Sequence, residues 1–112
     1  MSIRDSHCHF FSRIFFETLI HEQASTNIKN IDEVITQHLG WEAPKSPELL
    51  SDRWCQELDH HDIEQAALIA SVPGDEDSVA SALARHPKRF VGFFMLDPTR
   101  PDACSRTKRA LS

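Results

Sequence analysis

The period of the apolar positions changes several times along the chain, and each change predicts a new element. Residues 2–9 alternate as in a short strand, and helical spacing follows within residues 11–44. Two apolar stripes lie in that region: Ile14, Phe15, Leu19 and Ile20, and then Ile31, Val34, Ile35 and Leu39. Gly40 is placed to end the second of these helices, and the prolines that follow predict a loop.

A third helix is predicted over residues 47–61, with Ser46 as its N-cap and Pro47 in its first turn. Its expected inner face consists of Leu50, Trp54, Leu58 and His61. Residues 64–72 are continuously apolar, which is typical of a strand buried on both faces.

The rest of the chain repeats this alternation of helix and strand. Residues 74–87 predict a helix that begins at Gly74 and Asp75. Residues 89–97 predict a third, buried strand, and residues 98–112 begin a last helix. Strands separated by helices indicate an α/β fold with a parallel sheet. Three strands leave an apolar edge bare, and a (β/α)8 barrel or a flavodoxin-like sheet needs more, so we expect further strands outside this sequence.

Composition narrows the class of protein. The chain has 112 residues, 40% of them hydrophobic and 26% charged, as in a globular domain. Its net charge of −5 argues against nucleic-acid and membrane-surface partners, which need clustered basic residues. The one basic run, residues 106–109, is expected to be a solvated helix face. Neither a membrane-spanning run nor a signal peptide is evident, so a cytoplasmic location is expected.

The cysteines and the isolated histidines do not indicate a further metal or catalytic site. Cys8, Cys55 and Cys104 are an odd number without metal-site spacing, which predicts reduced thiols, with Cys8 buried and structural. The histidines at helix ends or in the cap are interpreted as having no metal-binding role: His21, His38, His60, His61 and His86. Trp41 is interpreted as packing within the residues 11–44 region rather than contacting a substrate.

The strongest candidate site is the segment "DSHCHF" in the first strand. Because side chains alternate faces, Asp5, His7 and His9 point to one side and Cys8 to the other. Two imidazoles delivered to one point suit zinc and neighbouring divalent metals, although such a pair is also common as surface or hydrogen-bonded core histidines. Asp5, one pleat deeper, is expected to be a polar core residue and not a ligand.

The string from Asp5 to Phe10 resembles the first strand of the amidohydrolase-related family (amidohydrolase 2), which comprises metal-dependent barrel hydrolases and decarboxylases. Two further segments are similar in order and spacing, residues 54–71 and residues 82–103, the latter with the "HP-x-RF-x-G" entry to a strand and a "DP-x-x-P" turn. The long insertion after the first strand also resembles this family. Asp62 stands where the family favours glycine, and aspartate tolerates the left-handed conformation.

The resemblance implies that residues 1–112 form the first three-strand portion of a (β/α)8 TIM barrel, with a helical cap insertion over residues 11–44. It implies that His7 and His9 are two ligands of a divalent metal, foremost zinc, with manganese or iron as alternatives. The implied activity is hydrolysis of C–N or C–O bonds, or decarboxylation, of a small-molecule substrate, and a homo-oligomer is a further expectation. The family's other ligands, a histidine and an aspartate on later strands, have no counterpart here, so no turnover is expected from this chain alone.

Two alternatives remain open. A TatD-like metal-dependent deoxyribonuclease also begins with "D-x-H-C-H", but the helical insertion, the "MLDPTRP" segment in place of a histidine-bearing turn, and the acidic charge disfavour it. The third possibility is a non-catalytic barrel fragment, which the incomplete ligand set favours.

Overall fold

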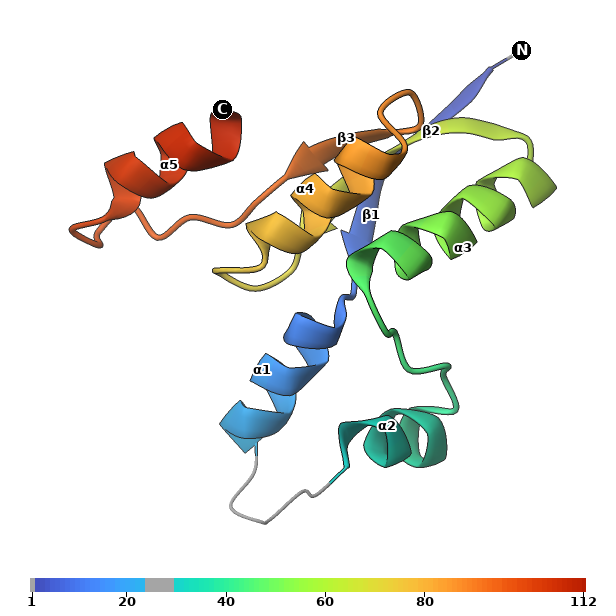
Figure 1. The fold of residues 1–112 in the computed structure, drawn as a ribbon, viewed down its shortest axis with the longest axis horizontal. Coiled ribbons are helices and arrows are strands. Elements are labelled where there is room, and N and C mark those ends of the chain that lie inside the picture. Colours follow the sequence, from blue (N-terminus) through green and yellow to red (C-terminus); the bar gives the residue numbers. More distant parts are fainter. Residues whose placement is uncertain (1, 24–29) are drawn as a thin grey trace.

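The computed structural model describes residues 2–23 and 30–112, and its centre is a sheet of three parallel strands in the order β1-β2-β3. The strands are β1 (Ile3–Phe10), β2 (Ile63–Ala70) and β3 (Phe90–Phe93) (Figure 1). Each pair is parallel and each connection contains helices, which confirms the α/β class with crossover helices. In the described part of the chain the sheet is open, with β1 and β3 as its two edges.

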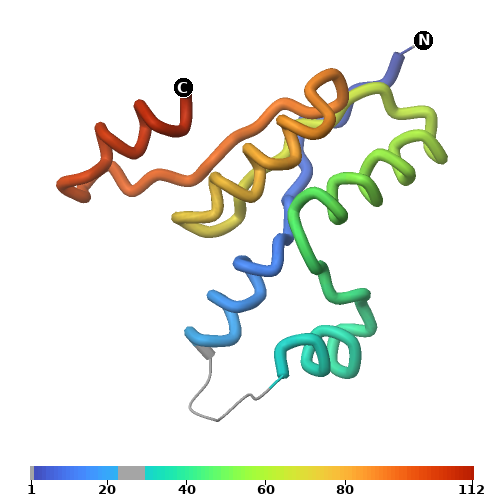
Figure 2. Tube along the Cα trace, in the orientation of Figure 1, coloured from blue at the N-terminus to red at the C-terminus, as the bar shows by residue number. Residues whose placement is uncertain are grey.

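The described residues form six helical segments, in the order expected from the apolar periods (Figure 2). They are α1 (Arg13–Gln23), α2 (Ile31–Val34), η1 (Ile35–Leu39), α3 (Pro47–His60), α4 (Glu76–Arg85) and α5 (Ala103–Leu111). The helix expected around residues 31–39 is thus a turn of α-helix continued by the π-helix η1. The cap region expected over residues 11–44 includes residues 24–29, which lie outside the described residues.

The expected helix ends are confirmed by their local geometry. The hydroxyl of Ser46 accepts a hydrogen bond from the Leu49 amide and caps α3, whose first residue is Pro47. Gly40 ends η1 with a φ of 67°. Asp62 follows α3 with a φ of 55°, the left-handed conformation that its place in the sequence predicted.

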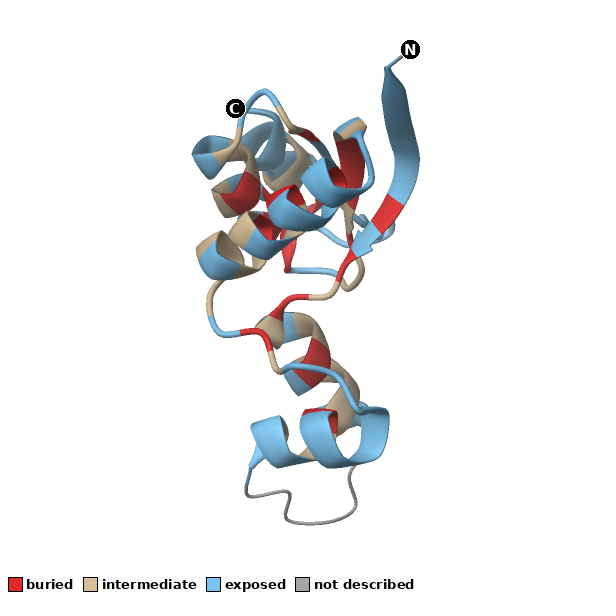
Figure 3. Ribbon diagram, turned by 90° about the vertical axis from the view of Figure 1, so that its right-hand side faces the viewer, coloured by how far each residue is buried: buried red, intermediate tan, exposed pale blue. Residues whose placement is uncertain are grey.

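Helices α3 and α4 cover one face of the sheet, and the core lies between them and the strands. Its buried residues are Cys8, Phe10, Cys55, Leu58, Ala66, Leu68, Ala70, Val79, Ala82 and Phe90. Gly92 allows α4 to approach β3, because a Cβ atom there would lie 2.8 Å from Val79 Cγ1. Figure 3 shows these buried residues gathered between the helices and the sheet, with β1 at the side of the molecule away from the helices.

Two expectations about extent and burial were wrong. The third strand ends at Phe93 and not at residue 97, because its partner β2 ends at Ala70 and β3 has no second neighbour among the described strands. The third strand was also expected to be buried, but only Phe90 of β3 is buried.

The inner face of α3 is confirmed for Leu58, Leu50 and Trp54, which lie in or against the core, and was wrong for His61. Ser51, Cys55 and Leu58 are buried, Leu50 and Trp54 are half-buried, and His61 lies exposed beyond the helix.

Helices α1, α2 and η1 form a separate group beyond the carboxyl end of β1 (Figure 1). Phe16 and Ile35 are the buried apolar residues of this group, and an ion pair from Arg13 to Asp32 links α1 to α2 at 2.6 Å. The helical character expected for this insertion is confirmed for the described residues.

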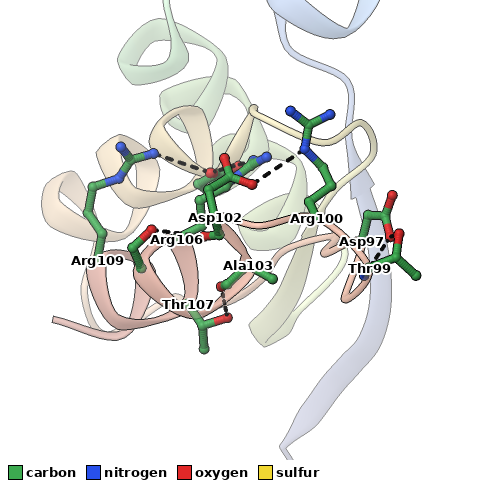
Figure 4. A network of polar contacts seen from close by, with 10 residues as sticks. Asp97, Thr99, Arg100, Asp102, Ala103, Arg106, Thr107 and Arg109 are labelled. Carbon is green, nitrogen blue, oxygen red and sulfur yellow. Dashed lines mark hydrogen bonds and ion pairs between the residues drawn. The ribbon is translucent and has the colours of Figure 1, made fainter.

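Helix α5 is held mainly by ion pairs to α4. The guanidinium of Arg106 donates to Glu76 Oε1 at 2.9 Å, and Arg109 approaches the same oxygen at 3.5 Å. Local contacts order the preceding turn, including the hydrogen bonds from Thr99 to Asp97 and from Arg100 to Asp102 (Figure 4). Burial raises the pKa of the Glu76 carboxyl, but the hydrogen bond and the charge of Arg106 together with backbone hydrogen bonds outweigh this, and the pKa is lowered.

Within residues 2–23 and 30–112, no helix has the length and apolarity required to cross a membrane.

Candidate metal centre

The two histidines of β1 converge as strand alternation predicted. Both rings are exposed on the face of the sheet opposite α3 and α4, while Cys8 and Phe10 point into the core. His7 Nε2 and His9 Nε2 lie 3.1 Å apart, and the ring planes meet at 73°. Two side chains from one strand therefore present their outer nitrogens to a single point.

This separation fits a shared metal ion. Two nitrogens that are each about 2.0–2.1 Å from one zinc ion lie roughly 3.0–3.4 Å apart, depending on the coordination angle. The imidazole nitrogens at 3.1 Å fall within that range. The donor set of two neutral imidazoles suits zinc better than it suits calcium or magnesium, which require oxygen ligands.

Ser71 fixes the orientation of the His9 ring, and sequence reasoning did not identify it. Its hydroxyl lies 3.0 Å from His9 Nδ1 and donates to the Ile69 carbonyl. When the Ser71 hydroxyl donates to the Ile69 carbonyl, its oxygen can accept from a protonated Nδ1, and in that tautomer of His9 the lone pair is on Nε2. Its position in the sequence could have identified it, since Ser71 directly follows β2 and therefore lies at the same end of the sheet as His9.

The expectation that Asp5 is a polar core residue was wrong. It is exposed and not part of the core. The prediction that it shares a face with His7 and His9 was also wrong, because the pairing is irregular between Asp5 and Cys8 and the register aligns Asp5 with the core residue Ala66. Its Oδ1 accepts the backbone amide of His7 at 3.0 Å, and this hydrogen bond lowers the pKa of the Asp5 carboxyl. The contact lies where the pairing of β1 with β2 is irregular, between Asp5 and Cys8. Asp5 therefore shapes the strand beside His7.

Cys8 lies between the two histidines in the sequence, but its side chain is buried on the opposite face of the strand. Burial raises the pKa of its thiol to about 12, with a further contribution from Asp5. The Cys8 thiol lies in the core on the face away from the histidine pair, which agrees with the buried position expected for it.

An aromatic cluster adjoins the histidine pair. The ring of His9 stacks on Phe11 at a centroid distance of 5.7 Å, and Phe11 stacks in turn on Phe15 at 4.4 Å. Trp41 packs against Phe11 and Phe16, as expected for a residue that packs within the insertion, while half of its surface remains exposed. The insertion thus contributes a flat apolar surface next to His9.

A buried carboxylate joins the loops that follow β1 and β2. Asp75 is fully buried and accepts hydrogen bonds from Ser78 and, at 2.5 Å, from Ser12. The Ser12 hydroxyl also accepts from the Phe15 amide at the start of α1. Burial raises the pKa of the Asp75 carboxyl, and the two serine hydroxyls oppose the rise. These bonds fix α1 relative to the loop that contains Ser71.

The other histidines lie apart from this pair. His60 and His61 are exposed at the end of α3, and His21 and His38 are exposed at helix ends, as expected. His86 is half-buried and contacts Asp52 at 2.7 Å. Across residues 2–23 and 30–112, no group of three histidine, cysteine or acidic residues is arranged to hold a metal ion. The structure therefore brings together His7 and His9 and adds no third ligand from the residues that it describes.

Comparisons of this chain with protein-family models, with curated proteins and with solved structures gave no match.

Proposed function

We propose that this chain provides the first part of the metal site of a metal-dependent hydrolase of the amidohydrolase type, with His7 and His9 as two ligands of a divalent ion, foremost zinc. The observation that carries the proposal is the 3.1 Å separation of the two Nε2 atoms on one strand. Their place next to the carboxyl-end residue of β1 also supports it, because active sites of parallel α/β proteins gather at that end of the sheet.

In this proposal, residues of this chain bind the ion and orient the rings that hold it. Ser71 holds His9 with Nε2 directed at His7, the strand backbone fixes the spacing, and Phe11 backs the His9 ring. The ion supplies Lewis-acid activation of water and of a substrate carbonyl. In this proposal the reaction is hydrolysis of a C–N or C–O bond, or decarboxylation, of a small molecule, and the other ligands and the proton acceptor come from residues outside this sequence.

Metal titration of purified variants tests the ligand assignment. Zinc binding, measured by competition with a chromophoric chelator, is expected in the wild-type chain and is expected to fall at least tenfold in His7→Ala and in His9→Ala. His60→Ala and His61→Ala are matched controls, because they remove exposed histidines that are adjacent in sequence but lie on a helix end. Unchanged zinc affinity in both β1 variants would contradict the proposal.

A further inference from the structure

Asp75 lies at the start of α4, but its side chain does not cap that helix. An aspartate at the N-cap usually accepts a hydrogen bond from a backbone amide of the first turn, and Asp75 makes no such bond. Its two carboxylate oxygens instead accept serine hydroxyls, Oδ1 from Ser78 and Oδ2 from Ser12. Ser78 belongs to the same helix, whereas Ser12 lies 63 residues away, between β1 and α1.

The hydrogen bond between Ser12 and Asp75 is short and shielded from water. Asp75 is fully buried, and Ser12 is 2% exposed. Their oxygens lie 2.5 Å apart, a separation typical of a hydroxyl that donates to an ionised carboxylate, and such bonds are roughly twice as strong as bonds between neutral groups. A buried carboxylate without partners is costly, so this bond holds the two loops at a fixed separation.

Each end of this bond adjoins a residue that contacts the His9 ring. On the β1 side that residue is Phe11, which stacks on His9 at a centroid distance of 5.7 Å and directly precedes Ser12. On the β2 side it is Ser71, 3.0 Å from His9 Nδ1. The Asp75 amide donates at 3.3 Å to the carbonyl of the residue that follows Ser71. The contacts therefore form a closed ring around His9.

We propose that Asp75 is a positioning residue for His9, which acts through Ser12 on the Phe11 stack and through its own loop on Ser71. The inference rests on the proposed metal role of His9. The strand fixes the backbone of His9, but its exposed side chain can rotate, and metal binding requires Nε2 in one direction. Without the bond to Asp75, the two loops move independently and hold the ring less firmly.

Ser12→Ala and Ser78→Ala form a matched pair that tests this role. Both serines are 2% exposed, and each variant removes one hydroxyl from the same carboxylate, but only Ser12→Ala breaks the link between the two loops. Zinc affinity, measured by chelator competition, is expected to fall roughly tenfold in Ser12→Ala and to stay within about twofold of wild type in Ser78→Ala. Ser12→Thr keeps the hydroxyl and is expected to retain the zinc affinity.

Asp75→Asn separates the bridge from the cap of α1. The Ser12 hydroxyl accepts the Phe15 amide at the start of that helix, and this contact remains in Asp75→Asn. The change weakens the bond to Ser12 at nearly constant volume, and zinc affinity is expected to fall by at least about threefold. Asp75→Asn also serves as the second variant if Ser12→Ala loses its circular-dichroism spectrum.

The ring nitrogens of His9 provide a readout that a role in stability alone does not change. Long-range proton–nitrogen NMR spectra of the metal-free chain at about pH 8.5, where imidazole is neutral, distinguish a ring held in one tautomer from a ring that exchanges between two. We expect well-separated nitrogen shifts for His9 in the wild type and in Ser78→Ala. The two shifts are expected to converge in Ser12→Ala and in Asp75→Asn.

The outcomes separate this inference from the proposed function. Zinc affinity and His9 nitrogen shifts that stay unchanged in both Ser12→Ala and Asp75→Asn overturn the positioning role and leave the histidine ligands in place. Equal effects of Ser12→Ala and Ser78→Ala also overturn it, because general stability would then account for them. A wild-type chain that binds no zinc contradicts the proposed metal role, and the His9 shifts of the metal-free variants then decide whether Asp75 positions the ring.

Discussion

Ser71 orients the His9 ring through Nδ1, and this contact decides which nitrogen of His9 is free to bind a metal. Removal of its hydroxyl in Ser71→Ala leaves the ring free to rotate and to change tautomer. Loss of such an orienting contact typically lowers metal affinity by about 10–100-fold. We expect a loss in that range for zinc, measured by chelator competition at constant protein concentration.

Two further variants make the Ser71 prediction specific. Ser71→Thr keeps the hydroxyl and is expected to retain most of the zinc affinity. Ser105→Ala removes a serine hydroxyl on α5 that donates to the Asp102 carbonyl, and it is expected to leave zinc affinity unchanged. Equal affinity in the wild type and in Ser71→Ala would show that the strand alone orients His9.

For single residues, the sequence predicts contacts between neighbours on one strand, but it does not predict contacts between residues that only the folded chain brings together. The convergence of His7 and His9 follows from the alternation of neighbouring side chains, which is a local property. The contact between Ser71 and His9 joins residues 62 positions apart, and it depends on the pairing of β1 with β2. The position of Asp5 depends on the irregular pairing of β1 with β2 between Asp5 and Cys8, and simple alternation does not reveal that irregularity.

Asp52, on α3, links that helix to α4. Its carboxylate accepts two hydrogen bonds from Arg85, at 2.6 and 2.8 Å, and a third contact from His86 at 2.7 Å. The bonds to Arg85, followed by that to His86, lower the pKa of Asp52 from 3.8 to about 2. Asp52 therefore stays ionised in the folded protein at pH values where the unfolded chain takes up a proton.

The sign of the pH dependence follows from that lowered pKa. The contribution of Asp52 to the free energy of unfolding is complete above about pH 4 and is lost as the pH falls toward about 2. We expect Asp52→Asn to lower the urea midpoint at about pH 6, and we expect the difference from wild type to shrink below about pH 4. Glu33→Gln, which changes an exposed carboxyl on α2, is the control and is expected to show little difference at either pH. A difference that stays constant over this range would contradict the assigned role.

The elements themselves could be predicted where the signal is local. The Ser46 cap, Pro47 and the left-handed positions Gly40 and Asp62 have side-chain or backbone preferences that act within a few residues, and each was confirmed. The end of β3 could not be predicted in this way. Residues 94–97 are apolar enough for a strand, but a strand also needs a partner, and β2 ends at Ala70.

The whole molecule is more extended than a closed domain of its length. Its radius of gyration is 15.2 Å, whereas about 13 Å is typical for this number of residues. The helical group formed by α1, α2 and η1 extends away from the sheet (Figure 3). The face of the sheet opposite α3 and α4, which we call the open face, carries His9, Ile69, Val91 and Phe93 and has no covering layer in the described structure. The sequence anticipated a bare apolar edge from the number of strands, but not that the histidine pair and Phe93 share one face.

A hydrophobic fluorescent dye distinguishes a contiguous apolar surface from scattered apolar residues, because the dye needs a patch larger than a single side chain. We expect the folded chain without metal to enhance the fluorescence of anilinonaphthalene sulfonate, and the double variant Val91→Thr, Phe93→Thr to lose most of that signal. Leu49→Thr is the matched control, since Leu49 is equally exposed at 53% but lies on α3, away from the open face. An equal loss in Leu49→Thr and in the double variant would show that the dye does not report on the open face.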